Sequence, residues 1–241
     1  MIVSNMFIYK FKNIIKFKEP KGFTLAELAI AITTIGIILA IILPTAINNA
    51  QQSQYYTQTT NAYLYLSNAL AEIPIQNKGI IHVGNGNTMD NNNAFRNDLC
   101  NVLRCIKMDN SVNIAGNINY MNYKSGSVGY FSTGWDYNPG AVLENGAYLV
   151  SVNSYNGCNS GALGNACGTF YIDTNGGGQG PNMFGDDFHG FNVVKNSNGA
   201  YSLMPWGMPG DGATACTAGA IAWEGSQGCA YQRIFFPNNM P

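Results

Sequence analysis

The first part of the chain carries an unbroken hydrophobic run. Phe23–Ile47 reads FTLAELAIAITTIGIILAIILPTAI, 25 residues in which Glu27 is the only ionisable side chain. At about 1.5 Å per residue, a helix of this length spans roughly 37 Å, whereas the hydrocarbon core of a bilayer is about 30 Å thick. The pattern therefore predicts a helix that crosses a membrane.

Helical spacing continues after the composition turns polar. Apolar and aromatic residues recur at steps of three and four, which predicts an amphipathic continuation packed against a sheet. They are Tyr55, Tyr56, Ala62, Tyr63, Leu66, Ala69, Leu70 and Ile73. Pro74 should end this run. Residues 23–73 are thus predicted to form one long helix, with a kink or local melting at Pro44, which lacks a backbone donor.

The second part of the chain has the pattern of a sheet. Residues 75–126 are rich in asparagine and glycine, and 84–93 is the loosest tract. Short alternating stretches bounded by Gly, Asn or Pro are strand candidates. They are Ser127–Ser132, Ala147–Val152, Thr169–Asp173, Phe188–Lys195 and Gln232–Phe236. One long helix followed by hairpin-connected strands predicts an α+β fold with an antiparallel sheet.

Charge is scarce, at 10% of residues, and it is unevenly placed. Residues 1–22 hold five lysines and one glutamate, whereas the chain after Gly22 holds 7 bases and 12 acids, a net charge of −5. Lysines precede the hydrophobic run, and none occurs in the thirty residues after it. By the positive-inside rule, the N-terminal end is predicted to lie in the cytoplasm and the rest of the chain to be exported. The acidic balance of the exported part argues against strong affinity for nucleic acid.

Gly22 and Glu27 mark a processing site and a charge inside the apolar helix. The run is longer than a secretory signal, and the small residue lies before it rather than after it. Cleavage after Gly22 would remove the basic leader and keep the helix. A carboxylate in mid-bilayer costs roughly 2.5–3.5 kcal/mol and needs a partner. The new amino group of Phe23 on a neighbouring helix is one candidate, and headgroup water is the alternative.

The segment Lys21-Gly22-Phe23-Thr24-Leu25-Ala26-Glu27-Leu28 resembles the prepilin leader motif of type IV pilins and type II secretion pseudopilins. The resemblance covers residues 21–73. It implies cleavage after Gly22 by a prepilin peptidase, methylation of Phe23, and a pilin-like fold. Gly36 and Pro44 fall where the family commonly has helix-loosening residues. The long leader of 22 residues is a departure from the family pattern.

The resemblance implies a structural subunit with three parts. These are a leader at 1–22 that is removed, a helix at 23–73 whose segment 23–47 serves as membrane anchor and filament core, and an exported globular domain at 74–241. Its partners would be membrane lipid, the peptidase, an inner-membrane assembly platform and homologous subunits. It would start in the inner membrane and end in a pilus or pseudopilus. The alternative is a minor pilin that binds a surface or DNA.

Six cysteines lie on the exported side, which favours disulfides. They are Cys100, Cys105, Cys158, Cys167, Cys216 and Cys229. Fifteen connectivities are open, and pairing of nearest neighbours is the simplest. A zinc site is the alternative, but there is no CxxC motif, and His82 and His189 lie at no ligand spacing to the cysteines.

The loop between Tyr171 and Phe188 gathers carboxylates, amides and glycines. Calcium takes six to eight oxygen ligands, and glycines let a loop wrap around it, so the composition suits calcium. The loop also resembles a C-terminal loop of pseudopilins, which implies calcium ligands at Asp173, Asn175, Asn182 and Asp187, with Asp186 in reserve. The alternative is a hairpin loop whose Asp and Asn side chains cap backbone amides.

The usual catalytic constellations are missing from the sequence. There is no GxSxG, no HExxH and no phosphate-binding GxxxxGK[ST] motif. A triad would have to use His82, expected on the surface or in a strand, or His189, expected beside the predicted calcium loop. The sequence therefore predicts no enzyme and no organic cofactor.

Overall fold

The computed structural model describes residues 22–76, 81, 89–109, 140–159, 164–176, 178–209, 216 and 229–240. The chain divides into two compact units, Met1–Asn49 and Ala50–Pro241. The predicted strand at Ser127–Ser132 and the predicted surface residue His82 lie outside the described residues.

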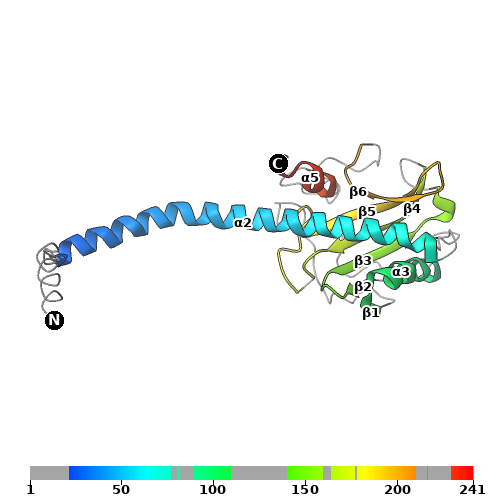
Figure 1. Ribbon diagram of the computed structural model, residues 1–241, viewed down its shortest axis with the longest axis horizontal. Helices are drawn as coiled ribbons and strands as arrows, with labels where there is room; N and C mark the ends of the chain where they lie inside the picture. Colours follow the sequence, from blue (N-terminus) through cyan, green and yellow to red (C-terminus); the bar gives the residue numbers. More distant parts are fainter. Residues whose placement is uncertain are drawn as a thin grey trace, which may run out of the picture. The chain divides into compact units, whose positions relative to one another are not determined.

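The long N-terminal helix is present. Helix α2 spans Leu25–Gln76 and is continuous through Gly36 and Pro44 (Figure 1). The helix is unbroken at Pro44, so the predicted local melting is absent, and the alternative, a kink, stays a prediction. Pro74 lies in the last turn, and the helix ends three residues later than predicted.

The second half of α2 packs as its spacing predicts. Ala62, Leu66, Leu70 and Ile73 lie on one face and are buried, with at most 9% of any of them exposed. Steps of three and four place these residues along one stripe of the helix. This stripe forms one wall of the main hydrophobic core of the Ala50–Pro241 unit.

Among the described residues, the sheet has six strands in sequence order, each antiparallel to the next. The strands are β1 (Cys105–Asp109), β2 (Gly140–Leu143), β3 (Tyr148–Ser154), β4 (Ala166–Asp173), β5 (Phe188–Lys195) and β6 (Tyr201–Pro205). The strands predicted at Ala147–Val152, Thr169–Asp173 and Phe188–Lys195 are confirmed as β3, β4 and β5. The α+β class, with a long helix and an antiparallel sheet, is confirmed as well.

Two segments differ from the sequence prediction. Gln232–Phe236, predicted as a strand, lies mostly in helix α5 (Cys229–Phe235), because Ala230 and Ile234 are four residues apart and share one buried face. Met89–Leu103, expected to be irregular, forms helix α3. Its apolar residues Phe95, Leu99 and Leu103 recur every four positions and are fully buried, so packing overrides the poor helix propensity of its asparagines.

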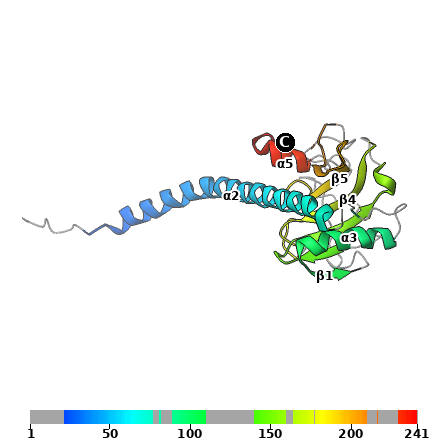
Figure 2. The same ribbon diagram turned by 45° about the vertical axis from the view of Figure 1, so that its right-hand side comes forward.

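Apolar residues line both faces of the sheet. The main core joins α2 and α3 to Phe170, Phe191 and Val193 of β4 and β5. Figures 1 and 2 show α3 beside the end of α2, next to the sheet. The second cluster is aromatic and contains Tyr171, Phe184 and Phe188, with Trp206 packed against it. Two short 3-10 helices, η2 (Asn156–Cys158) and η3 (Pro237–Asn239), complete the described elements.

Candidate assembly, loop and buried polar sites

Thr24 and Glu27 close the N-terminal end of α2 with a capping box. The backbone N–H of Glu27 donates to Thr24 Oγ1 at 3.2 Å, and the Thr24 N–H and hydroxyl both donate to Glu27 Oε2 at 2.9 Å. Glu27 therefore has a partner within its own chain. Both partners predicted for Glu27 from the sequence lie outside the chain, although Thr-x-x-Glu is a recognised capping signal.

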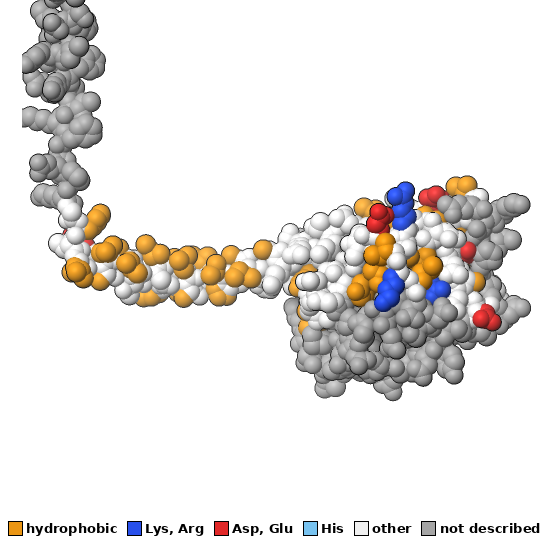
Figure 3. All heavy atoms as spheres, turned by 90° about the horizontal axis from the view of Figure 1, so that it is seen from below, with side chains coloured by type: hydrophobic (Ala, Val, Ile, Leu, Met, Phe, Trp, Pro, Cys, Tyr) orange, Lys and Arg blue, Asp and Glu red, His pale blue; other side chains and the backbone are white. Residues whose placement is uncertain are grey.

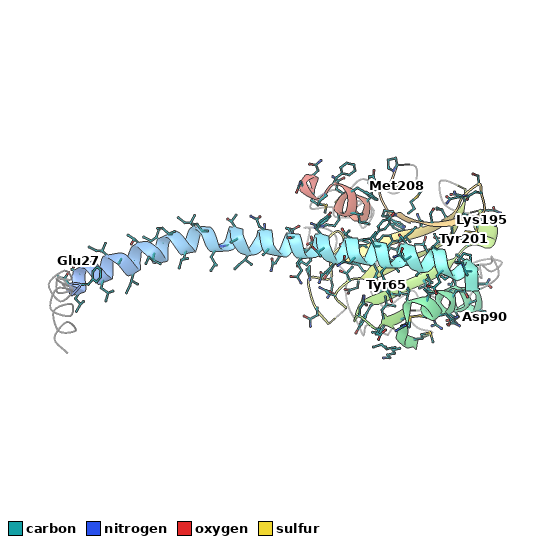
Figure 4. All side chains as sticks on the ribbon, in the orientation of Figure 1. Glu27, Tyr65, Asp90, Lys195, Tyr201 and Met208 are labelled. Atoms are coloured by element: carbon teal, nitrogen blue, oxygen red, sulfur yellow. A yellow bond between two sulfur atoms is a disulfide. The ribbon has the colours of Figure 1, made fainter. Side chains whose placement is uncertain are left out.

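The rest of this segment is an uncovered apolar surface. Every residue from 22 to 49 is exposed, including Phe23 at 86% and Ile41 at 71%. Hydrophobic side chains stud this stretch in Figure 3, and Figure 4 shows Glu27 near the start of the helix. Among the described helices, α2 is the one long and apolar enough to cross a membrane. Gly36 has open space around it, with nothing within 4 Å of an added Cβ.

The predicted calcium loop brings its four residues together around buried carboxylates. Asp187 is fully buried, and its Oδ2 accepts hydrogen bonds from the Asn182 N–H at 2.9 Å and the Asn175 side-chain amide at 3.2 Å. Its Oδ1 accepts the Met183 N–H at 2.7 Å. Burial raises the pKa of Asp187, and these donors act in the opposite direction by stabilising the charged form.

Asp173 is bonded in the same way. Its Oδ1 accepts backbone N–H groups from Asn175 at 3.3 Å and Gly176 at 3.0 Å. With its amide nitrogen turned inward, Asn182 donates to Asp173 Oδ2 at 3.3 Å and to the Gln179 carbonyl at 3.2 Å. The loop is therefore an Asx-type hairpin connection held by its own donors.

These donors bear on whether calcium fits the loop. N–H dipoles point their positive ends at both carboxylates, whereas a cation needs converging oxygens. Asn175 Oδ1 is a buried oxygen without a hydrogen bond, which is the type of ligand that calcium takes. No group of three or more His, Cys, Asp or Glu among the described residues could hold a metal. The donor set fits an internally bonded loop better than a calcium cage, and the calcium site stays a prediction.

Arg233 lies at the centre of a buried polar network that the sequence did not indicate. It is 1% exposed, and its Nη2 pairs with Asp186 Oδ1 at 2.6 Å. Nε donates to the Gly185 carbonyl at 2.6 Å, and Nη1 donates to Gln52 Oε1 at 2.7 Å. Asp186, the reserve calcium ligand, thus pairs with an arginine, and the network joins α5 to α2 across the loop before β5.

His189 extends this network into β5. Its Nε2 lies 2.7 Å from Thr59 Oγ1 and 3.1 Å from the Asp186 carbonyl. The Thr59 hydroxyl donates to the Tyr55 carbonyl, so Nε2 carries the proton and donates to both oxygens. Burial, with the Arg233 charge nearby, lowers the pKa of His189 to about 3. His189 is therefore neutral at pH 7 and fixes α2 to the sheet.

All six cysteines are paired, and pairing of nearest neighbours is confirmed. The disulfides are Cys100–Cys105, Cys158–Cys167 and Cys216–Cys229. The first links the last turns of α3 to β1, the second links η2 to β4, and the third holds the start of α5.

In comparisons with known proteins, no family model, curated protein or solved structure matches the chain.

Proposed function

We propose that this chain is a filament subunit of the type IV pilin or pseudopilin kind. It is inserted in the cytoplasmic membrane, cut after Gly22, and assembled with other subunits through its N-terminal helix. The prepilin leader motif at residues 21–28 supports the cleavage and the methylation of Phe23. The α+β architecture, with a long helix ahead of an antiparallel sheet, is compatible with this family.

The observation that carries the proposal is the uncovered surface of residues 25–47. A side chain such as Leu or Ile is worth about 1.5–3 kcal/mol when it is removed from water, so this surface cannot remain in water. Lipid is one cover for it, and other copies of the same helix are another. The segment retains its hydrophobicity after leader removal, which suits a helix that exchanges lipid for neighbouring helices.

Glu27 gives the assembly its register in this proposal. Both Thr24 donors reach the same oxygen, Oε2, so the capping box leaves Oε1 for a second donor. The α-amino group of a neighbouring Phe23, created by cleavage, would supply that donor at the apolar interface. An ion pair removed from water fixes axial position because any other register leaves two charges unpaired.

The test begins with mass spectrometry of the mature protein. We expect its N-terminus to be a methylated Phe23. The Glu27→Gln variant should insert and be cut as before, but its filament yield should fall at least tenfold, because the carboxylate is lost while the side-chain shape is kept. Glu72→Gln, at another exposed position of α2, is the matched control.

One outcome would contradict the subunit proposal, and another would contradict only the register role of Glu27. A mature chain that lacks residues 23–47 would make the helix a discarded signal. Normal filaments from Glu27→Gln would leave the subunit assignment in place but remove the register role of Glu27.

A further inference from the structure

The three disulfides join cysteines in the order in which the chain presents them. The partners are 5, 9 and 13 residues apart. Much longer stretches separate one pair from the next, 53 residues from Cys105 to Cys158 and 49 from Cys167 to Cys216. No bridge encloses or crosses another, so each pair closes within its own segment of the chain.

This spacing favours the native pairs even before the chain folds. The effective concentration of two points on a flexible chain falls as about the −3/2 power of their separation. Cys158 therefore meets Cys167 roughly 14-fold more often than it meets Cys105, and Cys216 meets Cys229 roughly 7-fold more often than it meets Cys167. A chain that emerges from its N-terminal end adds to this bias, because each pair is complete before the next cysteine arrives.

Burial sets the time at which the bridges form. Cys167 and Cys229 are fully buried, and Cys100 and Cys158 are each 7% exposed. Three of these sulfurs lie in the main core with Phe95 and Leu99. A thiolate of the chain has to reach the disulfide of an oxidising protein in order to attack it. Oxidation must therefore come before the core closes.

We propose that this chain is the substrate of a dithiol oxidase on the exported side of the membrane, and that its maturation needs no disulfide isomerase. The inference rests on the export of the globular unit in the proposed function. In each of three rounds, a thiolate of the chain attacks the disulfide of the oxidase and forms a mixed disulfide. The neighbouring thiolate then displaces the oxidase. Two thiols become one disulfide, and the oxidase disulfide becomes a dithiol, so two electrons and two protons pass to it.

The experiment follows the full chain in host cells that are unaltered, that lack disulfide isomerase, or that lack the dithiol oxidase. Free thiols are alkylated at lysis, and the bridges are mapped by mass spectrometry of proteolytic fragments. We expect the three native bridges, in equal yield, in unaltered and isomerase-deficient cells. In oxidase-deficient cells we expect at least a tenfold rise in alkylated cysteine.

A single substitution tests the independence of the pairs. In Cys158→Ser we expect the Cys100–Cys105 and Cys216–Cys229 bridges to form in full, with Cys167 recovered in its alkylated form. The mapping does not require the variant to fold, so a destabilised core does not obscure the result.

Three results would overturn the inference. Bridges between pairs in isomerase-deficient cells would show that rearrangement is needed. Capture of Cys216 or Cys105 by Cys167 in the variant would show that the pairs are not independent. Six free thiols in unaltered cells would remove the exported location and the proposed function with it, whereas the first two results leave that function intact.

Discussion

The buried His189 predicts that the folded state loses stability in mild acid. The imidazole titrates near its ordinary pKa of 6.5 in the unfolded chain and at about 3 in the folded one. Above pH 6.5 both states are neutral at this residue, and its contribution to stability is complete. As the pH falls from 6.5 towards 3, the unfolded state takes up the proton and the folded state does not, so stability is progressively lost.

The size of the effect follows from this difference. Each pH unit within the window costs about 1.4 kcal/mol, so the free energy of unfolding should be about 2 kcal/mol lower at pH 5 than at pH 7.5. A protonated His189 would also lie near Arg233, a second buried cation. Asp187 acts in the opposite direction, because its raised pKa makes the folded state bind a proton more readily. That contribution is common to the unaltered protein and to a variant that differs only at residue 189, so it cancels when the two are compared.

Urea unfolding of the disulfide-bonded fragment 50–241, followed by intrinsic fluorescence at pH 7.5 and pH 5, measures the effect. The matched variant is His189→Gln, whose side-chain amide can donate to Thr59 and to the Asp186 carbonyl but does not titrate. His82 is present in both proteins, so its titration cancels in the difference. The free energy of unfolding of the unaltered protein minus that of His189→Gln should be about 2 kcal/mol lower at pH 5 than at pH 7.5. A change below about 0.5 kcal/mol would refute the reasoning.

Three further predictions concern the interior and the loop. Arg233→Ala should lower the free energy of unfolding by about 3–5 kcal/mol because it removes the guanidinium from its buried ion pair with Asp186, and adding Asp186→Asn should restore part of the loss in urea unfolding. Gly168→Ala places a Cβ 2.6 Å from the Asn153 carbonyl oxygen and 2.6 Å from a Phe95 ring carbon, so thermal unfolding should show a loss of about 1–3 kcal/mol, whereas Gly178→Ala, with open space around it, should change little. The predicted calcium site should give a heat of binding in calorimetry that Asp187→Asn removes. If the unaltered protein gives no heat, the loop is held by its own N–H donors and does not bind calcium.

Much of the fold could be predicted because its signals are local. The stripe on α2 repeats over enough residues to set the element type and the buried face. The apolar run of β5 sets the element type, and β5 is buried on both faces. The disulfides were predictable because their cysteines are neighbours in sequence. Helix α3 was missed because its first turns are mostly asparagine, and only the contacts of Phe95 and Leu99 with distant segments make it helical.

The polar interior could not be predicted in the same way. Arg233 and Gln52 are 181 residues apart, and nothing near either residue in sequence indicates that they meet. The loop at 173–187 shows a second limit of prediction from sequence, which concerns what its oxygens bind. Its composition predicted a gathering of oxygens, and the side chains do gather, but composition does not say whether N–H groups or a cation will meet those oxygens.

The contact between Arg233 and Gln52 affects how the sheet resists a pulling force on the C-terminal end of the chain. In a sheet whose strands follow one another in sequence order, the final strand has a neighbour on one side only, and a pull on the chain end can peel the strands away one at a time. Here the tail beyond β6 returns to α2 and is fastened there by a guanidinium that water does not reach. Tension on the C-terminal end therefore acts on α2 as well as on β6, so the strands are less easily separated one at a time.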